Sequence, residues 1–402
     1  MESTAVERTP AAGENIQLLR KSRGMSQTKL ARTASVSTSL LSKIEQGIRA
    51  ASPPVVAAIA EALHVSTARI YGQPFMGPSE QSDLMTKLRT VVRGYTLPKE
   101  DVPPPEELAK DLRKAGELRA STKYLELLRM LPRLLGQVTA AAMEEPGETV
   151  VWSDVADVYG CAYSVAHRLV QPDLADLVVA RQTWAARQTW NPRAEAGAAW
   201  NEAGTHQSAG HYGDGLAIID RAITGYERAL RLGPATQEEV HALGSLHLRG
   251  VVLASRAKDH GATRSHVEKA KALAEQMPHD VLAHNTTFGP GNVALYELAS
   301  HIELGRPDEA TELSGPLIRT PPQGLRPSRI GRLCIDAARA HLAVNDHSGA
   351  EEALRQAHKV TPQMAQVHPM AREVLRVLVI HHERSKPELV TMAQRSGLMA
   401  EL

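Results

Sequence analysis

Polar side chains suited to contacting a nucleic-acid duplex are concentrated between residues 26 and 49. Ser26 and Ser37 each precede a short segment in which apolar residues recur at helical spacing. A serine in that position accepts a hydrogen bond from the first, otherwise unpaired, backbone amides of a helix. The two serines therefore predict the starts of two short helices, which are joined by a tight turn.

The second of these helices has two different faces. Leu41 and Ile44 give it an apolar side that must pack inward. Small polar residues occupy the opposite side, namely Thr38, Ser39, Ser42 and Lys43. Hydroxyl and ammonium groups donate to base edges, and Gln27 lies at the amino end of the first helix, where free N–H groups favour a phosphate. The segment therefore predicts a unit that reads DNA.

This string resembles the lambda-repressor-like (Xre-type) helix-turn-helix family, whose members carry Arg-Gly-Leu-Ser-Gln, Leu-Ala, Val-Ser and Leu-Ser-x-Ile-Glu-x-Gly. The corresponding segments here are residues 23–27, 30–31, 36–37 and 41–47. The resemblance covers residues 14 to 72 and implies base contacts by the second helix, phosphate contacts by Gln27 and Arg49, and an internal pair between Arg20 and Glu45. The candidate DNA-binding residues are Gln27, Ser37, Thr38, Ser39, Ser42, Lys43 and Arg49.

Two charged residues of the motif, Glu45 and Lys43, allow a second interpretation. We favour a structural role for Glu45, because a carboxylate aimed at phosphates would repel them. Lys43 could simply be solvated, although its place one turn beyond Ser39 favours groove contact. The turn carries Ser35 where the family usually has Gly, so a left-handed backbone there would cost energy.

The distribution of charge and the Pro/Gly-rich segments divide the 402-residue chain into candidate domains. Residues 14–72 contain eight Lys or Arg against three Glu, a charge of +5, so the remainder of a chain with net charge +1 carries −4. A local cationic excess is what counterion release from a duplex requires. We expect a flexible tail at 1–13, the DNA-binding domain at 14–72, a Pro/Gly-rich linker with a connecting helix at 73–105, and a larger domain at 106–402.

The larger domain is predicted to be all-helical. It is rich in Ala, Leu, Arg and Glu, with periodic apolar residues and turn signals every fifteen to twenty-five residues. Segments 209–215, 304–310 and 344–350 each fit the turn between two helices of a tetratricopeptide-like repeat. The expected fold class is therefore all-α, with a five-helix lambda-repressor-like domain followed by a tetratricopeptide-like helical-repeat domain.

A second resemblance covers the C-terminal half. Segments 288–293, 303–305, 336–340 and 368–373 are similar to large actinobacterial Xre-type regulators that bear a tetratricopeptide-like domain. This resemblance implies a transcription regulator, often dimeric, with an effector that is unknown for most members of the family. It does not supply the ligand.

Catalytic, metal-binding and membrane-spanning motifs are not apparent. His382-Glu383 would need a histidine at position 386 for a zinc-protease helix, and Lys386 stands there. Cys161 and Cys334 are far apart in sequence and predict neither a disulfide framework nor a zinc cluster. No run of about 18 uncharged apolar residues occurs. We expect no enzyme activity, no cofactor, no metal site, no membrane association and a cytoplasmic location.

A candidate effector site lies near the long Pro/Gly-containing segment 277–292. Its proposed residues are Asn285, Phe288, Asn292, Tyr296 and Arg332. Structural alternatives exist: Asn292 could cap a helix starting at Val293, and Asp336 could simply pair with Arg339. Trp184, Trp190 and Trp200, which cluster in sequence, are expected to pack between helices.

The sequence thus favours a DNA-binding regulator, acting as a homodimer on an inverted-repeat operator in double-stranded DNA, with sensing of a small-molecule or peptide effector in the repeat domain. The alternative is a scaffold or antitoxin-like protein, whose repeat domain binds a protein partner while the DNA domain localises it.

Overall fold

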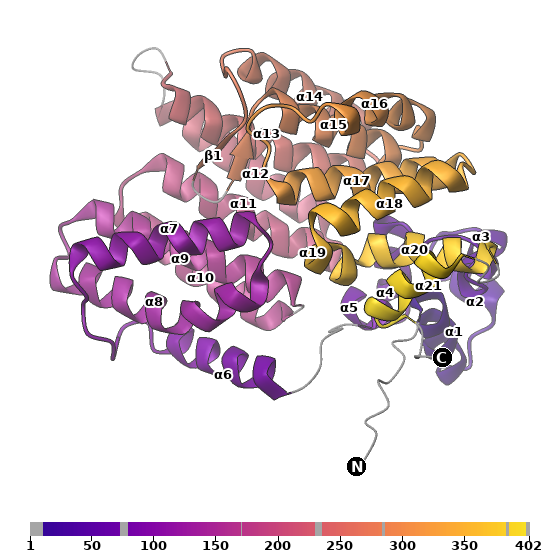
Figure 1. The fold of residues 1–402 in the computed structure, drawn as a ribbon, viewed down its shortest axis with the longest axis horizontal. Coiled ribbons are helices and arrows are strands. Elements are labelled where there is room, and N and C mark those ends of the chain that lie inside the picture. The colour runs from indigo at the N-terminus through magenta and orange to yellow at the C-terminus, as the bar shows by residue number, and fades with distance from the viewer. Residues whose placement is uncertain are drawn as a thin grey trace.

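The computed structural model describes residues 11–72, 79–169, 171–229, 235–283, 286–382 and 386–398. In these ranges the chain is helical apart from one short β-hairpin, and it forms a small N-terminal domain against a larger helical one (Figure 1). The predicted all-α fold class is therefore confirmed. No helix in the described ranges is both long and apolar enough to cross a membrane.

The N-terminal domain contains the five predicted helices. They are α1 (Ala12–Ser22), α2 (Gln27–Thr33), α3 (Thr38–Glu45), α4 (Pro53–Ala62) and α5 (Thr67–Tyr71). Ile16, Leu30, Leu41 and Ile59 are completely buried in their shared core. Helix α1 begins at Ala12, two residues before the predicted domain boundary at residue 14. Gly13 packs closely on the end of α3, where a side chain would overlap the Ile44 carbonyl. Of the predicted tail, residues 1–10 lie outside the described residues.

The larger domain is a series of helices that pack mainly on their neighbours in sequence. These helices are α6 (Ser79–Arg93), α7 (Pro105–Ala120), α8 (Tyr124–Glu144), α9 (Thr149–Arg168), α10 (Pro172–Gln188), α11 (Pro192–Ala209), α12 (Tyr212–Ala229), α13 (Gln237–Arg256), α14 (His260–Ala274), α15 (Pro290–Glu303), α16 (Pro307–Arg319), α17 (Pro327–Ala343), α18 (His347–Val360), α19 (Pro362–Val367), α20 (Pro369–His381) and α21 (Pro387–Arg395). The pairs α11–α12, α15–α16 and α17–α18 turn at the three predicted tetratricopeptide-like turns.

Helix α6 belongs to the helical domain, whereas the sequence placed it as a connecting helix within a linker spanning residues 73–105. Met85, Leu88 and Val92 are buried in the same core as α7–α10, and Arg89 donates to Gln171 Oε1 at 2.6 Å. Apolar residues at helical spacing made α6 predictable, but only packing shows which domain it joins. Residues 73–78 lie outside the described part.

The long segment predicted as a loop contains a β-hairpin. Strands β1 (Val281–Ala283) and β2 (Thr286–Phe288) pair antiparallel, with Val281 opposite Phe288. The Phe288 ring is fully buried and lies over Gly244 of α13, where a side chain would overlap it. Phe288 therefore anchors the hairpin to α13.

The two domains contact each other through α5 and α4. Tyr71, the last residue of α5, packs against both the N-terminal core and the core of α17–α21. Thr67 Oγ1 donates to the Ser208 carbonyl at 2.8 Å, and Ala57 lies against Gly210 in the α11–α12 turn. The N-terminal domain therefore contacts both the α11–α12 turn and the core of α17–α21.

We expect Gly244→Ala to destabilise the protein by about 2 kcal/mol, because the added methyl group overpacks against the Phe288 ring. Urea unfolding measures the loss. Gly116→Ala, at a helical position with open space around it, is the matched control and should be neutral or slightly stabilising. Equal stability of the two variants would contradict the anchoring role of Phe288.

Candidate DNA interface and effector cavity

The start of each short helix is fixed by the predicted serine caps. Ser26 Oγ accepts from the Lys29 amide at 3.1 Å, and Ser37 Oγ accepts from the Leu40 amide at 3.1 Å. Ser35, in the turn between them, has a φ of 53° and so adopts the left-handed backbone that the sequence led us to expect. These caps and this turn set the direction in which α3 leaves α2.

Helix α3 presents the predicted polar face to solvent. Leu41 and Ile44 are buried beneath it. Ser37, Thr38, Ser39, Lys43 and Arg49 are exposed, and Ser42 is half-buried. Ser42 Oγ accepts from Gln46 Nε2 at 3.3 Å, so its own hydroxyl proton stays available to another acceptor. The surface offers donors and a cation, which suits a duplex groove.

A buried charge pair holds this surface in place, as predicted. Arg20 Nε and Nη2 donate to the two oxygens of Glu45 at 2.7 and 2.8 Å. Arg20 Nη1 also donates to the Met25 carbonyl at 2.8 Å. The side chains of Arg20 and Glu45 are only 9% and 1% exposed, so neither is free to contact DNA.

Gln27 joins this pair, which the sequence did not indicate. Its Nε2 donates to Glu45 Oε2 at 2.8 Å. One of its two amide hydrogens is therefore committed inside the domain, and the phosphate contact predicted for Gln27 would have to use its other hydrogen or its backbone N–H. Burial acts against the charge of Glu45, but the hydrogen bonds from Arg20 and Gln27 outweigh it and hold the Glu45 pKa below its usual value.

A cavity of about 50 Å³ opens in the helical domain where the end of α7 approaches the start of α17. Its wall includes the end of α7, one turn each of α11, α13 and α15, the β-hairpin and the start of α17. The lining residues are Arg119, Ala120, Trp200, Ser245, Leu248, Leu282, Thr286, Thr287, Tyr296, Arg326, Ser328 and Arg329.

Among the predicted effector residues, only Tyr296 lines this cavity. Asn285 lies outside the described residues. Phe288 is buried against Gly244 and acts as a packing residue. Arg332 is engaged elsewhere: its Nε donates to Asp336 Oδ2 at 2.6 Å, and its Nη1 lies 2.7 Å from His368 Nε2.

Asn292 is also a structural residue, although it is not the helix cap considered above. Helix α15 begins at Pro290, and its first-turn amides are capped by Asp280, whose carboxylate accepts from Gly291 at 3.0 Å and from Asn292 at 2.8 Å. Asn292 Nδ2 donates to the Thr287 carbonyl at 2.5 Å. It therefore ties the hairpin to α15. A distant carboxylate supplies the cap, and sequence spacing could not reveal it.

Four residues that line the cavity were not among the predicted effector residues: Arg119, Trp200, Arg326 and Arg329. Trp200 packs against the core of α11–α13 as expected, and it also lines the cavity, with the Arg249 guanidinium 3.4 Å from its ring centroid. Trp184 does pack in the core, edge-on to Trp152 at 5.0 Å. Trp190 is 87% exposed, which contradicts its expected burial, because it follows α10 in a left-handed turn.

A buried ionic network continues along α17 from the cavity. Arg339 donates to Asp336 at 2.9 Å, which confirms the pairing considered from sequence, and also to Glu303 of α15 at 2.8 Å. Each of these charges is at least nine-tenths buried and is matched by an opposite charge. The network fixes α17 against α15.

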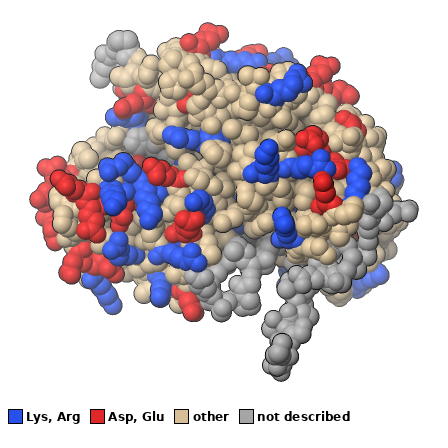
Figure 2. All heavy atoms as spheres, in the orientation of Figure 1, with Lys and Arg blue, Asp and Glu red and all other residues tan. Residues whose placement is uncertain are grey.

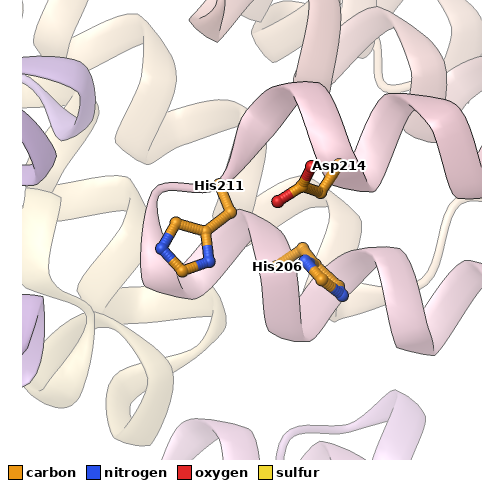
Figure 3. A group of neighbouring side chains, drawn as sticks. All are labelled: His206, His211 and Asp214. Atoms are coloured by element: carbon orange, nitrogen blue, oxygen red, sulfur yellow. The ribbon is translucent and has the colours of Figure 1, made fainter.

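Three possible metal ligands also meet, at the turn between α11 and α12, where the sequence predicted none. Figure 3 shows His206, His211 and Asp214, whose ligand atoms all lie within 4.8 Å of one another. Ligand atoms around a tetrahedral zinc ion lie about 3.4 Å apart, given bonds of about 2.0–2.1 Å. The limit of 4.8 Å is looser than that spacing, so the arrangement of these three side chains does not by itself define a zinc site.

These features together define a DNA-binding protein of the helix-turn-helix class. Residues 16–70 match the helix-turn-helix family. That match confirms the resemblance drawn from the N-terminal motif. No curated protein matches the chain in sequence.

The similar solved structures are distant. BtubC from P. vanneervenii is 12% identical, with a TM-score of 0.38 over 65% of this chain and 94% of BtubC. PlcR from Bacillus thuringiensis, solved with the peptide PapR7 and DNA, is 14% identical, with a TM-score of 0.27 over 90% of this chain and 98% of PlcR. A mutant of PrgX is 9% identical, with a TM-score of 0.25 over 95% and 99%. Likeness this remote says nothing of what the present chain binds.

Glu45→Gln should destabilise the N-terminal domain by about 3 kcal/mol at pH 7, because it leaves Arg20 buried opposite a neutral group. Since the folded-state pKa of Glu45 is lowered, its stabilisation is present above the ordinary carboxylate pKa of about 4.3 and is lost as pH falls through the folded value. Thermal unfolding between pH 7 and about pH 3 measures both effects. Glu61→Gln, on the exposed side of α4, is the control. A Glu45→Gln variant as stable as wild type would refute this role.

Proposed function

We propose that this protein is a sequence-specific transcriptional regulator that binds operator DNA as a homodimer and whose helical domain senses an effector. The observation that supports DNA reading best is the exposed polar face of α3, held outward by the Arg20–Glu45 pair. Its functional groups are Thr38, Ser39 and Lys43 for base edges and Arg49 for phosphate, with Gln27 contributing from the start of α2.

Dimerisation follows from the small size of this surface. One short helix with three base-contacting side chains gives little affinity, whereas two copies on an inverted repeat double the contacts. Their recognition helices would enter the major groove about 34 Å apart, one turn of the duplex. A monomer in analytical ultracentrifugation at micromolar concentration, with and without operator, would count against the dimer.

Effector sensing is supported by the cavity and by the contacts between the two domains. The cavity borders α17, and the core of α17–α21 packs on Tyr71 of the DNA-binding domain. A ligand that binds one arrangement of these helices better than another shifts the population toward that arrangement. The spacing of the two recognition helices, and with it operator affinity, would change accordingly.

The scaffold alternative has one observation in its favour. Trp190, Leu97 and Val150 are large apolar side chains exposed on the helical domain, at 87, 75 and 69%. Exposed apolar residues mark a partner surface when they form one contiguous patch, which is what this alternative requires of these side chains. Trp190→Ser that abolishes co-purification of a protein partner, while operator binding stays intact, would favour this alternative.

The decisive experiment is genome-wide binding of the tagged protein followed by gel shifts on the recovered site at two salt concentrations. A sharp inverted repeat supports operator reading by a dimer. Diffuse binding that disappears with added salt would mean that the domain holds DNA through phosphates alone, and it would overturn the proposal.

Lys43→Ala should weaken operator binding by about 1–3 kcal/mol and relax base preference at one position, because Lys43 is exposed on the groove-facing side of α3. Gel shifts against operators with single base changes measure both effects. Lys110→Ala, an exposed lysine on α7, is the charge-matched control. A uniform loss on all sequences would assign Lys43 to phosphate contact instead.

A further inference from the structure

Three guanidinium groups line one small cavity. Arg119 comes from the last turn of α7, while Arg326 and Arg329 come from the start of α17. The lining residues include no aspartate or glutamate. The wall of this cavity is therefore cationic.

Two of these arginines have incomplete or long hydrogen bonds within the described part of the chain. Arg119 Nε is buried and has no hydrogen-bond partner in the part of the chain that the structure describes. Arg329 Nη1 donates to the Tyr296 hydroxyl at a long 3.5 Å. Burial lowers the pKa of Arg119 and the like charge of Arg329 acts in the same direction, while Cys161 and Asp157 act against them without cancelling the shift. A bound anion would relieve both costs.

Charges elsewhere on the same side of the molecule are arranged differently. Figure 2 shows basic and acidic side chains interspersed over the region of α7 and α8. Arg133, for example, pairs with Asp111 at 2.8 Å. The arginines at the cavity thus differ from such surface pairs, because no carboxylate lines the cavity wall with them.

The rest of the wall limits what the anion can be. Helix α7 ends and α17 begins at the cavity, so their dipoles oppose each other and the side-chain charges decide. A volume of about 50 Å³ holds a few water-sized groups, which is the size of one oxyanion. The Trp200 ring and the Tyr296 hydroxyl border the same space, and the Arg249 guanidinium lies over that ring, 3.4 Å from its centroid.

We propose that Arg119, Arg326 and Arg329 bind the oxyanion of the effector, a phosphate or carboxylate group carried on a small organic body. The arginine fork matches both oxyanions and can engage two of their oxygens at once. This assignment rests on the proposed function, for which it supplies the chemical class of the effector.

The placement of the three arginines gives the site a mechanical consequence. Arg119 belongs to the first helices of the domain, and Arg326 and Arg329 to α17, so one anion joins the two. Helix α17 is in turn fixed to α15 by Arg339 and Glu303, and its core contacts Tyr71. Ligand binding would therefore tighten the helical domain on the side that holds the DNA-binding domain.

Calorimetric titration of the full chain with phenyl phosphate, phenylacetate and neutral phenylacetamide tests the site. One or both oxyanions should bind, and the stronger of them tells whether the natural group is a phosphate or a carboxylate. Arg119→Gln, Arg329→Gln and Arg326→Gln should each lower that affinity about tenfold or more. Arg326 is exposed, so its variant keeps the fold and remains informative if the other two unfold.

Two controls make the result specific to the cavity. Arg113→Gln changes an exposed arginine on the same helix α7, and Lys43→Ala changes the DNA surface; both should leave oxyanion binding unchanged. Equal binding of phenylacetamide, no binding of either oxyanion, unaltered affinity in all three cavity variants, or loss of binding in Lys43→Ala would each overturn the proposal.

Gel shifts with the same preparations separate this inference from the proposed function. Intact operator binding together with failed oxyanion binding removes the oxyanion site alone. Oxyanion binding that depends on the three arginines, in a protein that binds no operator, would support the site and refute the regulator.

Discussion

The Glu45 carboxylate joins the three helices on which DNA reading would depend. Arg20 reaches it from α1, Gln27 from the start of α2, and Glu45 itself ends α3. Apolar burial is non-directional, so the core of this domain alone would tolerate small rotations of α3. Charge-assisted hydrogen bonds are short and directional, and a buried carboxylate that lost them would be costly. The orientation of the exposed face of α3 therefore follows from this one carboxylate.

Buried charges in the helical domain have two kinds of surroundings. Along α17, Asp336 and Arg339 are matched with each other and with Glu303, which stabilises one arrangement of α15 and α17. At the cavity, Arg119 and Arg329 have like charges, and the residues that line the wall include no aspartate or glutamate. The matched network is a rigid element of the fold, whereas the unmatched pair leaves a free-energy cost that a ligand can remove. Both act on the same helix, whose core reaches Tyr71.

Local features were predictable wherever a short stretch of sequence fixes the physics. The caps Ser26 and Ser37, the left-handed Ser35 and the inter-helix turns depend on neighbours within a few residues. The effector residues were less predictable because they depend on distant partners. The backbone amide of Asn292 donates to Asp280, and the Arg332 side chain is held by Asp336 and His368. Trp190 and Trp200 have the same side chain and lie ten residues apart, yet one is exposed and the other lines the cavity.

The sequence by itself determined the all-α class, the helix-turn-helix domain and the side of α3 that faces outward. These follow from 3.6-residue periodicity and capping, which are encoded within single helices. Only the tertiary structure decided that α6 joins the helical core, that Gln27 shares the Glu45 carboxylate, and that Arg119 meets Arg329 across about two hundred residues. The physical reason is that a cavity wall is assembled from helices distant in sequence, and a single chain's pattern specifies each helix face without specifying which faces meet.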